Sequence, residues 1–319
     1  MRLRELSPEE YVSEVLPLTA PLWAGRRTFD EYVTQTLEIA RSAYGQRCYR
    51  TIGLYDGKGL VTSFKRYVRS MHFGESRLRA LGIGAVFTPE EQRGRGYASV
   101  LLGMTLDRAR KERYDLAYLF SDIRPQFYAN IGFRELPSRG VTLRADALPA
   151  NRLDLAPLGD DDWAGVRRVY QLCEQRREAG FARSRSVWDW IQTRIHHGAE
   201  HALGQETNLV VRRGRAIEAY VFGVRSTERD TYIVDEYGFA DDAAAAAIPA
   251  LLRAAAGDLR RVAGWMPPTG ARRLLPHGVV RKRKRAILMM APLTAAGANL
   301  VRAIHDGTGG DFCWPTDHI

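Results

Sequence analysis

Residues 92–98, QRGRGYA, place two glycines and two arginines directly before a segment with the spacing of an amphipathic helix. A glycine-rich turn that leads into a helix leaves several backbone N–H groups unpaired beside the positive end of the helix dipole. Gly94 and Gly96 remove the side chains that would block a diphosphate, and Arg93 and Arg95 add positive charge. The segment therefore predicts an anion-binding turn. It has neither the GxxxxGK[ST] spacing of a nucleoside triphosphate loop nor the GxGxxG of a dinucleotide fold.

The elements around this turn are those of an α/β domain. Periodicity, capping residues and turn residues predict a strand near residues 3–6, helices over 8–17 and 28–44, a hairpin closed at Asp56-Gly57, a strand over 77–87, a helix over 97–113 and a buried strand over 116–121. In the helix, Val100, Leu101, Met104 and Leu106 or their neighbours are the expected buried face.

Two local features bear on ligand binding. Gly82 and Gly84 are unusual inside a strand, and they indicate a bulge or the close approach of a ligand backbone. Asp122 follows the buried strand and is expected to be the N-cap of a short helix that begins near residue 124 and stops at Gly132, with a catalytic role as the alternative.

These motifs resemble those of the GNAT acetyltransferase superfamily. RGRGYA fits its [QR]-x-x-G-x-[GA] coenzyme A loop at Arg93, Gly96 and Ala98, and QFYANIGF resembles its FYxxxGF segment, which contains Tyr128. The resemblance covers about residues 1–148. It departs at Ser121, where many members carry asparagine, and this affects the details of thiol contact.

The resemblance implies a binding site for acetyl-CoA and a general acid that protonates the leaving group. By it, Tyr128 protonates the leaving thiolate, whereas a core aromatic is the alternative role. The pantetheine would be held by Gly84, Ala85, Val86 and Phe87, and the pyrophosphate by Arg93, Gly94, Arg95, Gly96, Tyr97 and Ala98.

The second half repeats the order of elements without the anion-binding turn. Asp241 and Asp242 stand where a phosphate would need glycines and positive charge. Residues 149–294 are therefore interpreted as a degenerate GNAT-like domain that does not bind coenzyme A, and residues 277–293 resemble the closing strand pair of GNAT domains. The expected fold class is α/β (α+β), with two tandem GNAT-like domains, each a mixed, largely antiparallel sheet flanked by helices. Asp235 and Glu236 are candidates for binding a cationic substrate, and the alternatives are a polar strand edge or a partner for an arginine.

Residues 295–319 are expected to form a tail that returns to dock, because Phe312, Cys313 and Trp314 follow the flexible DGTGG segment. The first-domain strand LGIGAVF carries no carboxylate that could serve as a base. Resemblance to Eis-like acetyltransferases implies the main-chain carboxylate of Ile319 as that base, with Asp317 and His318 as alternatives. A tail that only covers exposed core is an equal alternative.

Composition limits the partners. The 319-residue chain has a net charge of +10, but only five of its 47 basic residues are lysines, which looks as much like genome composition as like a nucleic-acid footprint. The run 281–285 is interpreted as a solvated strand edge. Three dispersed cysteines and the absence of a membrane-length apolar run favour a protein of the reducing cytoplasm. His197 and His201 have helical spacing but no apparent third ligand, so no metal is expected.

The resulting prediction is an N-acetyltransferase that moves an acetyl group from acetyl-CoA to a primary amine by direct attack. The acceptor stays open between a small molecule, an aminoglycoside-like compound and a protein lysine, and so does the oligomeric state. The alternatives are an acyl-CoA sensor without turnover and a basic nucleic-acid-binding protein, which strong salt dependence of binding would distinguish.

Overall fold

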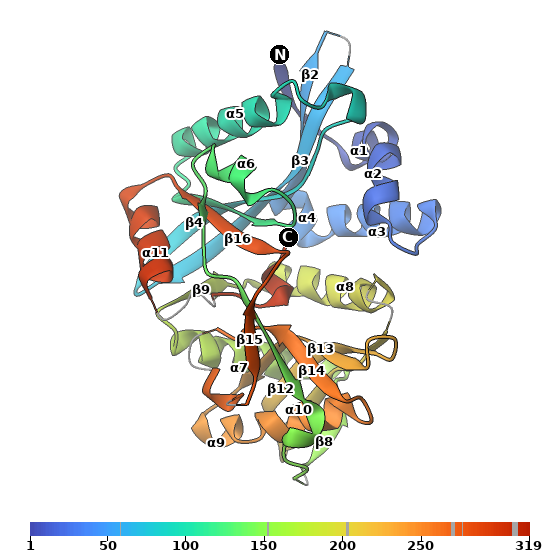
Figure 1. Ribbon diagram of the computed structural model, residues 1–319, viewed down its shortest axis with the longest axis vertical. Helices are drawn as coiled ribbons and strands as arrows, with labels where there is room; N and C mark the ends of the chain where they lie inside the picture. Colours follow the sequence, from blue (N-terminus) through green and yellow to red (C-terminus); the bar gives the residue numbers. More distant parts are fainter. Residues whose placement is uncertain (58, 152, 202–203, 269–271, 276, 308–311) are drawn as a thin grey trace.

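A computed structural model describes the chain except for residues 58, 152, 202–203, 269–271, 276 and 308–311, and side chains are not described over 196–203. Within the described residues the strands form two mixed sheets, one in each half of the molecule (Figure 1). Neighbouring strands there are antiparallel except for β4 with β5 and β13 with β14, which are parallel. The expected α/β fold class with two mixed, largely antiparallel sheets is confirmed.

The first sheet has the order β1 (Arg2–Leu6), β2 (Tyr49–Asp56), β3 (Gly59–Phe73), β4 (Ser76–Phe87), β5 (Leu116–Ser121), β16 (Ile287–Pro292) and β6 (Arg134–Glu135). Its helices are α1 (Pro8–Glu14), α2 (Leu16–Trp23), α3 (Phe29–Arg41), α4 (Ala43–Cys48), α5 (Tyr97–Lys111) and α6 (Pro125–Ala129).

The second sheet has the order β15 (Val279–Lys282), β7 (Arg139–Arg144), β14 (Arg261–Trp265), β13 (Thr231–Phe239), β12 (Ala216–Ser226), β11 (Leu209–Arg213) and β8 (Leu155–Pro157), and β10 (Gln205–Glu206) pairs with β12. Its helices are α7 (Trp163–Gln175), α8 (Arg185–His201), α9 (Asp242–Ala245) and α10 (Ile248–Ala256).

The two sheets exchange strands across the expected domain boundaries. β7 lies before residue 148 in the chain but pairs with β14 and β15 of the second sheet. β16 lies before residue 294 but pairs with β5 and β6 of the first sheet. The division into 1–148 and 149–294 therefore does not separate the sheets, and β15 and β16 do not form the expected closing pair. The two strands differ in burial. β16 is apolar and lies buried inside the first sheet, whereas the basic β15 is exposed at the edge of the second sheet.

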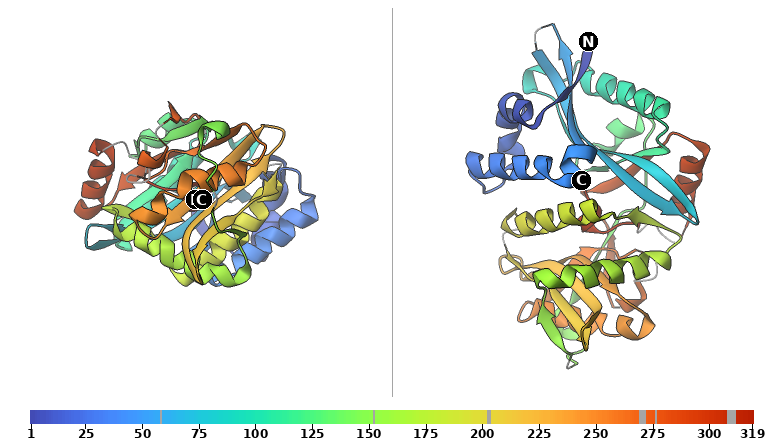
Figure 2. Two further views of the ribbon diagram at one scale, coloured as in Figure 1. Left: turned by 90° about the horizontal axis from the view of Figure 1, so that it is seen from below. Right: turned by 180° about the vertical axis from the view of Figure 1, so that it is seen from behind.

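A further strand joins the halves. β9 (Ala179–Ala182) lies in the second half of the sequence but pairs with the end of β3 at Ser70–Phe73, which the sequence did not predict. The right-hand view of Figure 2 and Figure 1 both place the C-terminus between the two halves.

Helix α5 covers one face of the first sheet. Its residues Leu101, Leu102 and Leu106 pack with Phe64 and Ile83 in one core cluster. Two of the residues expected in the core, Val100 and Met104, are exposed instead. The buried stripe is rotated because Thr105 and Ala109 face the sheet, where small side chains allow close packing.

The tail begins with a helix that the sequence analysis missed. α11 (Ala295–Asp306) starts at Thr294, whose hydroxyl accepts the Gly297 N–H at 3.2 Å, and it packs against β16 (Figure 1). Beyond it, Phe312, Cys313 and Trp314 are buried, so the apolar end of the chain is docked. Across the described residues, no helix combines the length and apolar character needed to span a membrane.

Candidate active site

The first sheet opens between its parallel strands. β4 and β5 pair from Ala80 with Leu116 to Gly82 with Tyr118, but β4 continues to Phe87 and β5 continues to Ser121. Beyond Gly82 the two strands therefore present backbone groups to a gap between them, the split, rather than to each other.

A β-bulge lies at the edge of the split. Ser63 pairs with Phe87 and Lys65 pairs with Gly84, so two residues of β4, Ala85 and Val86, oppose a single residue of β3. Ala85 has a φ of 47°, in the left-handed region that non-glycine residues rarely adopt. The bulge expected from the neighbouring glycines is present, and it frees the backbone groups that would hold an extended ligand.

The glycine-rich turn has the geometry of an anion cradle. Gly94 and Gly96 have φ values of 77° and 78°, and Gly96 begins α5 without a side-chain cap. The Val100 N–H donates to the Gly96 carbonyl at 3.1 Å, so the amides of the preceding turn have no intrahelical acceptor. A Cβ at either glycine would enter open space. These features fit a diphosphate at the start of the helix.

The two arginines of the turn differ. Arg93 donates from Nε to the Thr88 carbonyl at 3.2 Å, which fixes its side chain across the loop. Arg95 is exposed beside the turn. Both can add positive charge to the cradle.

Tyr128 lies on α6, on the α5 side of the split. Its ring packs edge-on against Phe127 and Phe133, with centroids 5.0 and 6.2 Å away, and it borders the same core cluster as Val86 and Tyr97. Burial raises the pKa of Tyr128 to about 12, and the charge of Asp122 adds to the shift. The phenol therefore stays protonated near neutral pH, as a proton donor must.

Asp122 does not cap α6. Arg124, with a φ of 58°, occupies the N-cap position, and the Asp122 carboxylate accepts the Ala286 N–H at 2.9 Å. The expected cap was wrong because Ala286, directly before β16, supplies a backbone donor from a distant part of the chain. Ser121 donates its hydroxyl to the Ile123 carbonyl at 3.0 Å.

The last residue of the chain lies against β4, on the face opposite α5. A Cβ at Gly84 would stand 3.3 Å from the Ile319 carbonyl carbon, and a Cβ at Gly82 would stand 2.6 Å from the Ile319 Cδ1. The sequence analysis expected a bulge or a ligand backbone at these glycines, whereas the close approach in the structure is made by the protein's own C-terminus. Among the described residues, no cation forms an ion pair with the Ile319 carboxylate.

A buried ion network holds the tail in this position. Asp317 Oδ1 lies 3.2 Å from Arg69 Nη2 and 3.0 Å from Arg183 Nη2, and Arg183 also pairs with Glu236 at 2.8 Å. All four side chains are at most 1% exposed. Thr316 in η5 (Pro315–Asp317) bonds the same Glu236 carboxylate. The network ties both halves to the tail, and it uses Asp317 structurally.

The penultimate residue is also packed. The His318 ring lies 4.8 Å from Phe120 and 5.9 Å from Trp265, and its carbonyl accepts from Arg194. Burial, reinforced by the charges of Arg194 and Arg283, lowers the pKa of His318 to about 3. Its ring is therefore neutral near pH 7.

Sequence reasoning missed Arg69 and Arg183. Neither carries a local motif, and Arg69 is 248 residues from its partner Asp317. The usable signal was Asp317 itself, an acid placed within an apolar anchor.

The second half has the same split without a cradle. β13 and β14 pair as far as Val234 with Gly264, and a bulge follows at Asp235, between the pairs Gly223–Val234 and Phe222–Glu236. Asp241, however, caps α9 by accepting the Ala244 N–H at 2.8 Å. The helix start is thus occupied by the protein's own carboxylate, which supports the degenerate assignment.

The two acids considered for substrate binding have different environments. Glu236 is the buried partner of Arg183, which bears out the arginine-partner interpretation. Asp235 is half-buried, and burial raises its pKa to about 7, with Arg194 acting in the opposite direction.

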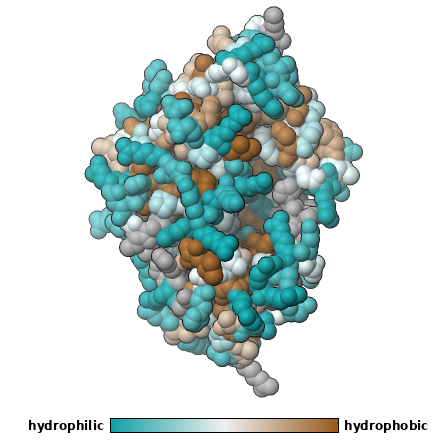
Figure 3. Space-filling model, viewed as in Figure 1, coloured by the Kyte–Doolittle hydropathy of each residue, from teal (hydrophilic) through white to brown (hydrophobic). Residues whose placement is uncertain are grey.

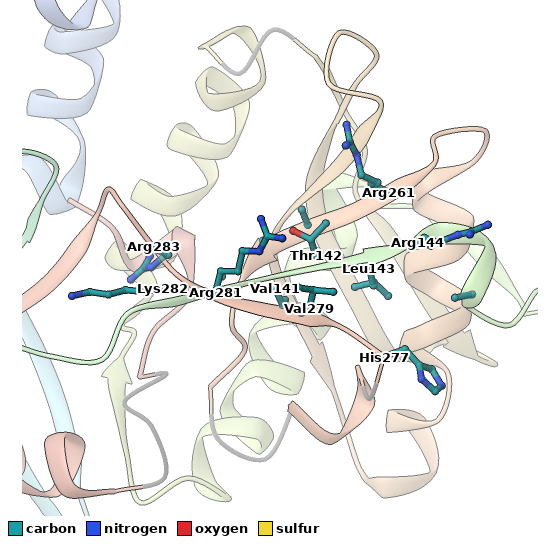
Figure 4. A pocket seen from close by; sticks show the side chains of 14 residues that line it. Val141, Thr142, Leu143, Arg144, Arg261, His277, Val279, Arg281, Lys282 and Arg283 are labelled. Carbon is teal, nitrogen blue, oxygen red and sulfur yellow. The ribbon is translucent and has the colours of Figure 1, made fainter.

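A separate groove of about 730 Å³ lies on the second sheet. Figure 4 shows Arg144, Arg261 and Arg281 along it, on β7, β14 and β15. As the solvated-edge interpretation expects, β15 is an edge strand, and its Lys282 pairs with Glu135 at 2.7 Å. The groove shares no residue with the split of the first sheet.

No group of three or more potential metal ligands occurs in the part of the chain that the structure describes. The side chains of His197 and His201 lie outside the described residues.

The split between β4 and β5, the bulge in β4 and the glycine-rich turn before α5 lie together in the first sheet. Residues 5–136 match the family model of an acetyltransferase (GNAT) domain. No curated protein matches the sequence.

Solved structures share the whole fold at low identity. A probable N-acyltransferase from Enterococcus faecalis V583 is 17% identical, with a TM-score of 0.72, over 93% of this chain and 73% of that one. Eis1 from Mycobacterium abscessus is 14% identical, with a TM-score of 0.61, over 92% and 73%. A tandem GNAT protein from the clavulanic acid biosynthesis pathway is 13% identical, with a TM-score of 0.54, over 92% and 98%. The chain therefore has the tandem GNAT fold.

Proposed function

We propose that this chain is an N-acetyltransferase that moves an acetyl group from acetyl-CoA to a primary amine. The observation that carries the proposal is the position of Ile319. Its carboxylate, which has no ion-pair partner among the residues that the structure describes, lies against Gly84, at the split that Tyr128 borders from the other face of the sheet. A base and an acid on opposite sides of one gap suit a reaction in which one group loses a proton and another gains one.

The proposed roles of the residues follow from this placement. The amides of residues 94–98 bind the diphosphate, and the backbone of residues 84–87 holds the extended pantetheine. The Ile319 carboxylate accepts the proton that the amine loses as its nitrogen bonds to the acetyl carbon. Tyr128 donates its proton to the sulfur as the carbon–sulfur bond breaks. A phenol with a raised pKa suits a thiolate, which is a stronger base than water.

The cellular setting follows from the thiols. Cys48, Cys173 and Cys313 are free, which supports our proposal of a reducing, cytoplasmic compartment.

Turnover by the full-length protein tests the proposal. Thiol release from acetyl-CoA should rise when a primary amine is added, and mass spectrometry should find the acetylated amine. Binding of acetyl-CoA without amine-dependent release would favour the sensor instead. Binding of DNA in place of acetyl-CoA, with steep loss in salt, would favour the nucleic-acid alternative.

A further inference from the structure

Lys65 lies on the same face of the first sheet as the end of the chain. It is the direct cross-strand partner of Gly84, so the two positions share a face, whereas the neighbouring Phe64 packs in the α5 core. Ile319 contacts Gly84 on this face. Lys65 therefore belongs to the side of the split where an acceptor amine would meet the proposed base.

Tyrosines enclose the Lys65 ammonium. Its Nζ lies 4.6 Å from the ring centroid of Tyr11 and 5.3 Å from that of Tyr49. Tyr32 and Tyr67 also lie close enough to act on its charge. All four tyrosines are at most 8% exposed, whereas Lys65 itself is half-buried. The enclosure holds a cation by its ring faces but supplies no negative charge.

No carboxylate in the described part of the chain forms an ion pair with Lys65. The buried cations nearby differ, because Arg69 and Arg183 both pair with Asp317. Burial lowers the pKa of Lys65, but the surrounding tyrosines outweigh this effect and raise the pKa above its usual value, so the ammonium stays charged without a carboxylate beside it. A ligand with a negative group would supply the missing partner.

The enclosure is continuous with the split. The Tyr67 ring would contact a Cβ at Gly84 at 3.1 Å, and it lies 5.1 Å from Tyr49 and 6.0 Å from Trp190 of α8. Figure 3 shows the surface hollowed near the middle of this view, with apolar atoms deeper in the recess. Tyr67 therefore lies between the tyrosines around Lys65 and the proposed site of acetyl transfer at Gly84.

We propose that the acceptor is an amine that also carries a carboxylate, and that Lys65 binds this carboxylate inside the tyrosine enclosure. The inference rests on the proposed function and narrows its substrate class. Lys65, with Arg194 held at the His318 carbonyl on the α8 side, opposes a polycationic acceptor by charge repulsion. The acids on this side are the Ile319 carboxylate, which lies against Gly84, and Asp235 on β13, on which Arg194 acts.

A series of ω-amino acids of increasing chain length, assayed as acetyl acceptors with the full-length protein, tests the proposal. Glycine, 4-aminobutyrate and 6-aminohexanoate are each compared with the corresponding primary amide, with acetyl-CoA as donor. At one length or more, kcat/KM for the acid should exceed that for the amide by roughly tenfold, the scale of a charge-assisted hydrogen bond. The preferred length reports the distance between Lys65 and the reacting nitrogen.

Substitution of Lys65 isolates its contribution. In Lys65→Met the acid-to-amide ratio should fall to about one, with kcat/KM for the amide little changed, and Lys65→Arg should keep part of the preference. The control is Lys111→Met, which removes an exposed lysine at the end of α5 and should leave the ratio unchanged. Because the ratio is compared between proteins, the different basicity of acid and amide cancels.

The outcomes separate the two proposals. Efficient acetylation of the amides without an acid preference, or an equal preference in Lys65→Met, would overturn the role of Lys65 and leave the acetyltransferase assignment intact. If Lys65→Met does not fold, Lys65→Gln takes its place, and an acid preference as large as that of the wild type would overturn the role of Lys65. If the protein acetylates neither these amines nor any other amine in a wider panel, both the acetyltransferase assignment and the role of Lys65 are rejected.

Discussion

Ile319 lies against Gly84, with its carbonyl carbon 3.3 Å from the position that a Cβ on Gly84 would take. The missing side chain thus leaves room for the main chain of the C-terminus at the split of the first sheet. The buried pair of Arg183 and Asp317 holds the tail two residues earlier. The position of the terminal carboxylate is therefore set by contacts on both sides.

Extension of the chain by two glycines after Ile319 should abolish most turnover, because it moves the carboxylate away from the split. Acetyl-CoA affinity by calorimetry and the melting temperature should change little, since residues 312–317 keep their contacts. Deletion of residues 317–319 is a poor substitute, because it leaves Arg69 and Arg183 buried without Asp317, at a cost of about 3–5 kcal/mol. An extended protein that acetylates at the wild-type rate would return the tail to a structural role.

Gly96→Glu should remove acetyl-CoA binding, because a carboxylate would enter the open space in front of the α5 amides. Part of the effect comes from strain, since Gly96 has a φ of 78°. Gly214→Glu is the matched control, because Gly214 has a φ of 60° and equally open surroundings in the β11–β12 turn. Both variants should lose about 1 kcal/mol of stability, whereas calorimetry should show lost affinity in Gly96→Glu alone. Equal affinity in the two would contradict the cradle.

Tyr128→Phe should lower kcat by roughly tenfold or more, the scale of a lost general acid, with a smaller change in cofactor affinity. The control Tyr114→Phe removes a hydroxyl from a tyrosine of the same core cluster and should keep wild-type turnover. Because the pKa of Tyr128 is about 12, the wild-type rate should not fall through loss of this proton below pH 10. Full activity of Tyr128→Phe would leave only the core role.

The pKa of His318 predicts a pH-dependent contribution to stability. It is about 3 in the folded chain, against an ordinary value of 6.5, so between these values the unfolded chain binds more protons at this site. Its contribution is complete above pH 6.5 and is lost as the pH falls toward 3. Relative to His318→Phe, the wild-type free energy of unfolding should fall by about 1.4 kcal/mol per pH unit below pH 6.

Denaturant titrations at pH 4.5–8 measure this slope. His305→Phe, at an exposed position on α11, is the control and should show no such slope relative to wild type. A pH-independent difference between wild type and His318→Phe would show that the ring is accessible to protons in the folded state.

Local segments were predicted where neighbouring residues determine the structure. Ser7 and Thr28 form the capping boxes of α1 and α3, because cap and partner are three residues apart. Errors arose where distant groups compete. Asp122 bonds to Ala286 rather than capping α6, and β9 pairs with β3 from the other half of the chain.

By itself, the sequence determined the anion cradle at Gly94 and Gly96 and its absence at Asp241, because positive φ and N-capping are local properties of a few residues. Only the tertiary structure decided which strands share a sheet and what lies at the split. The exchange of β7 and β16, the pairing of Asp317 with Arg69 and the approach of Ile319 to Gly84 join residues that are distant along the chain. Such contacts depend on shared burial of charge and apolar surface, which no short segment encodes.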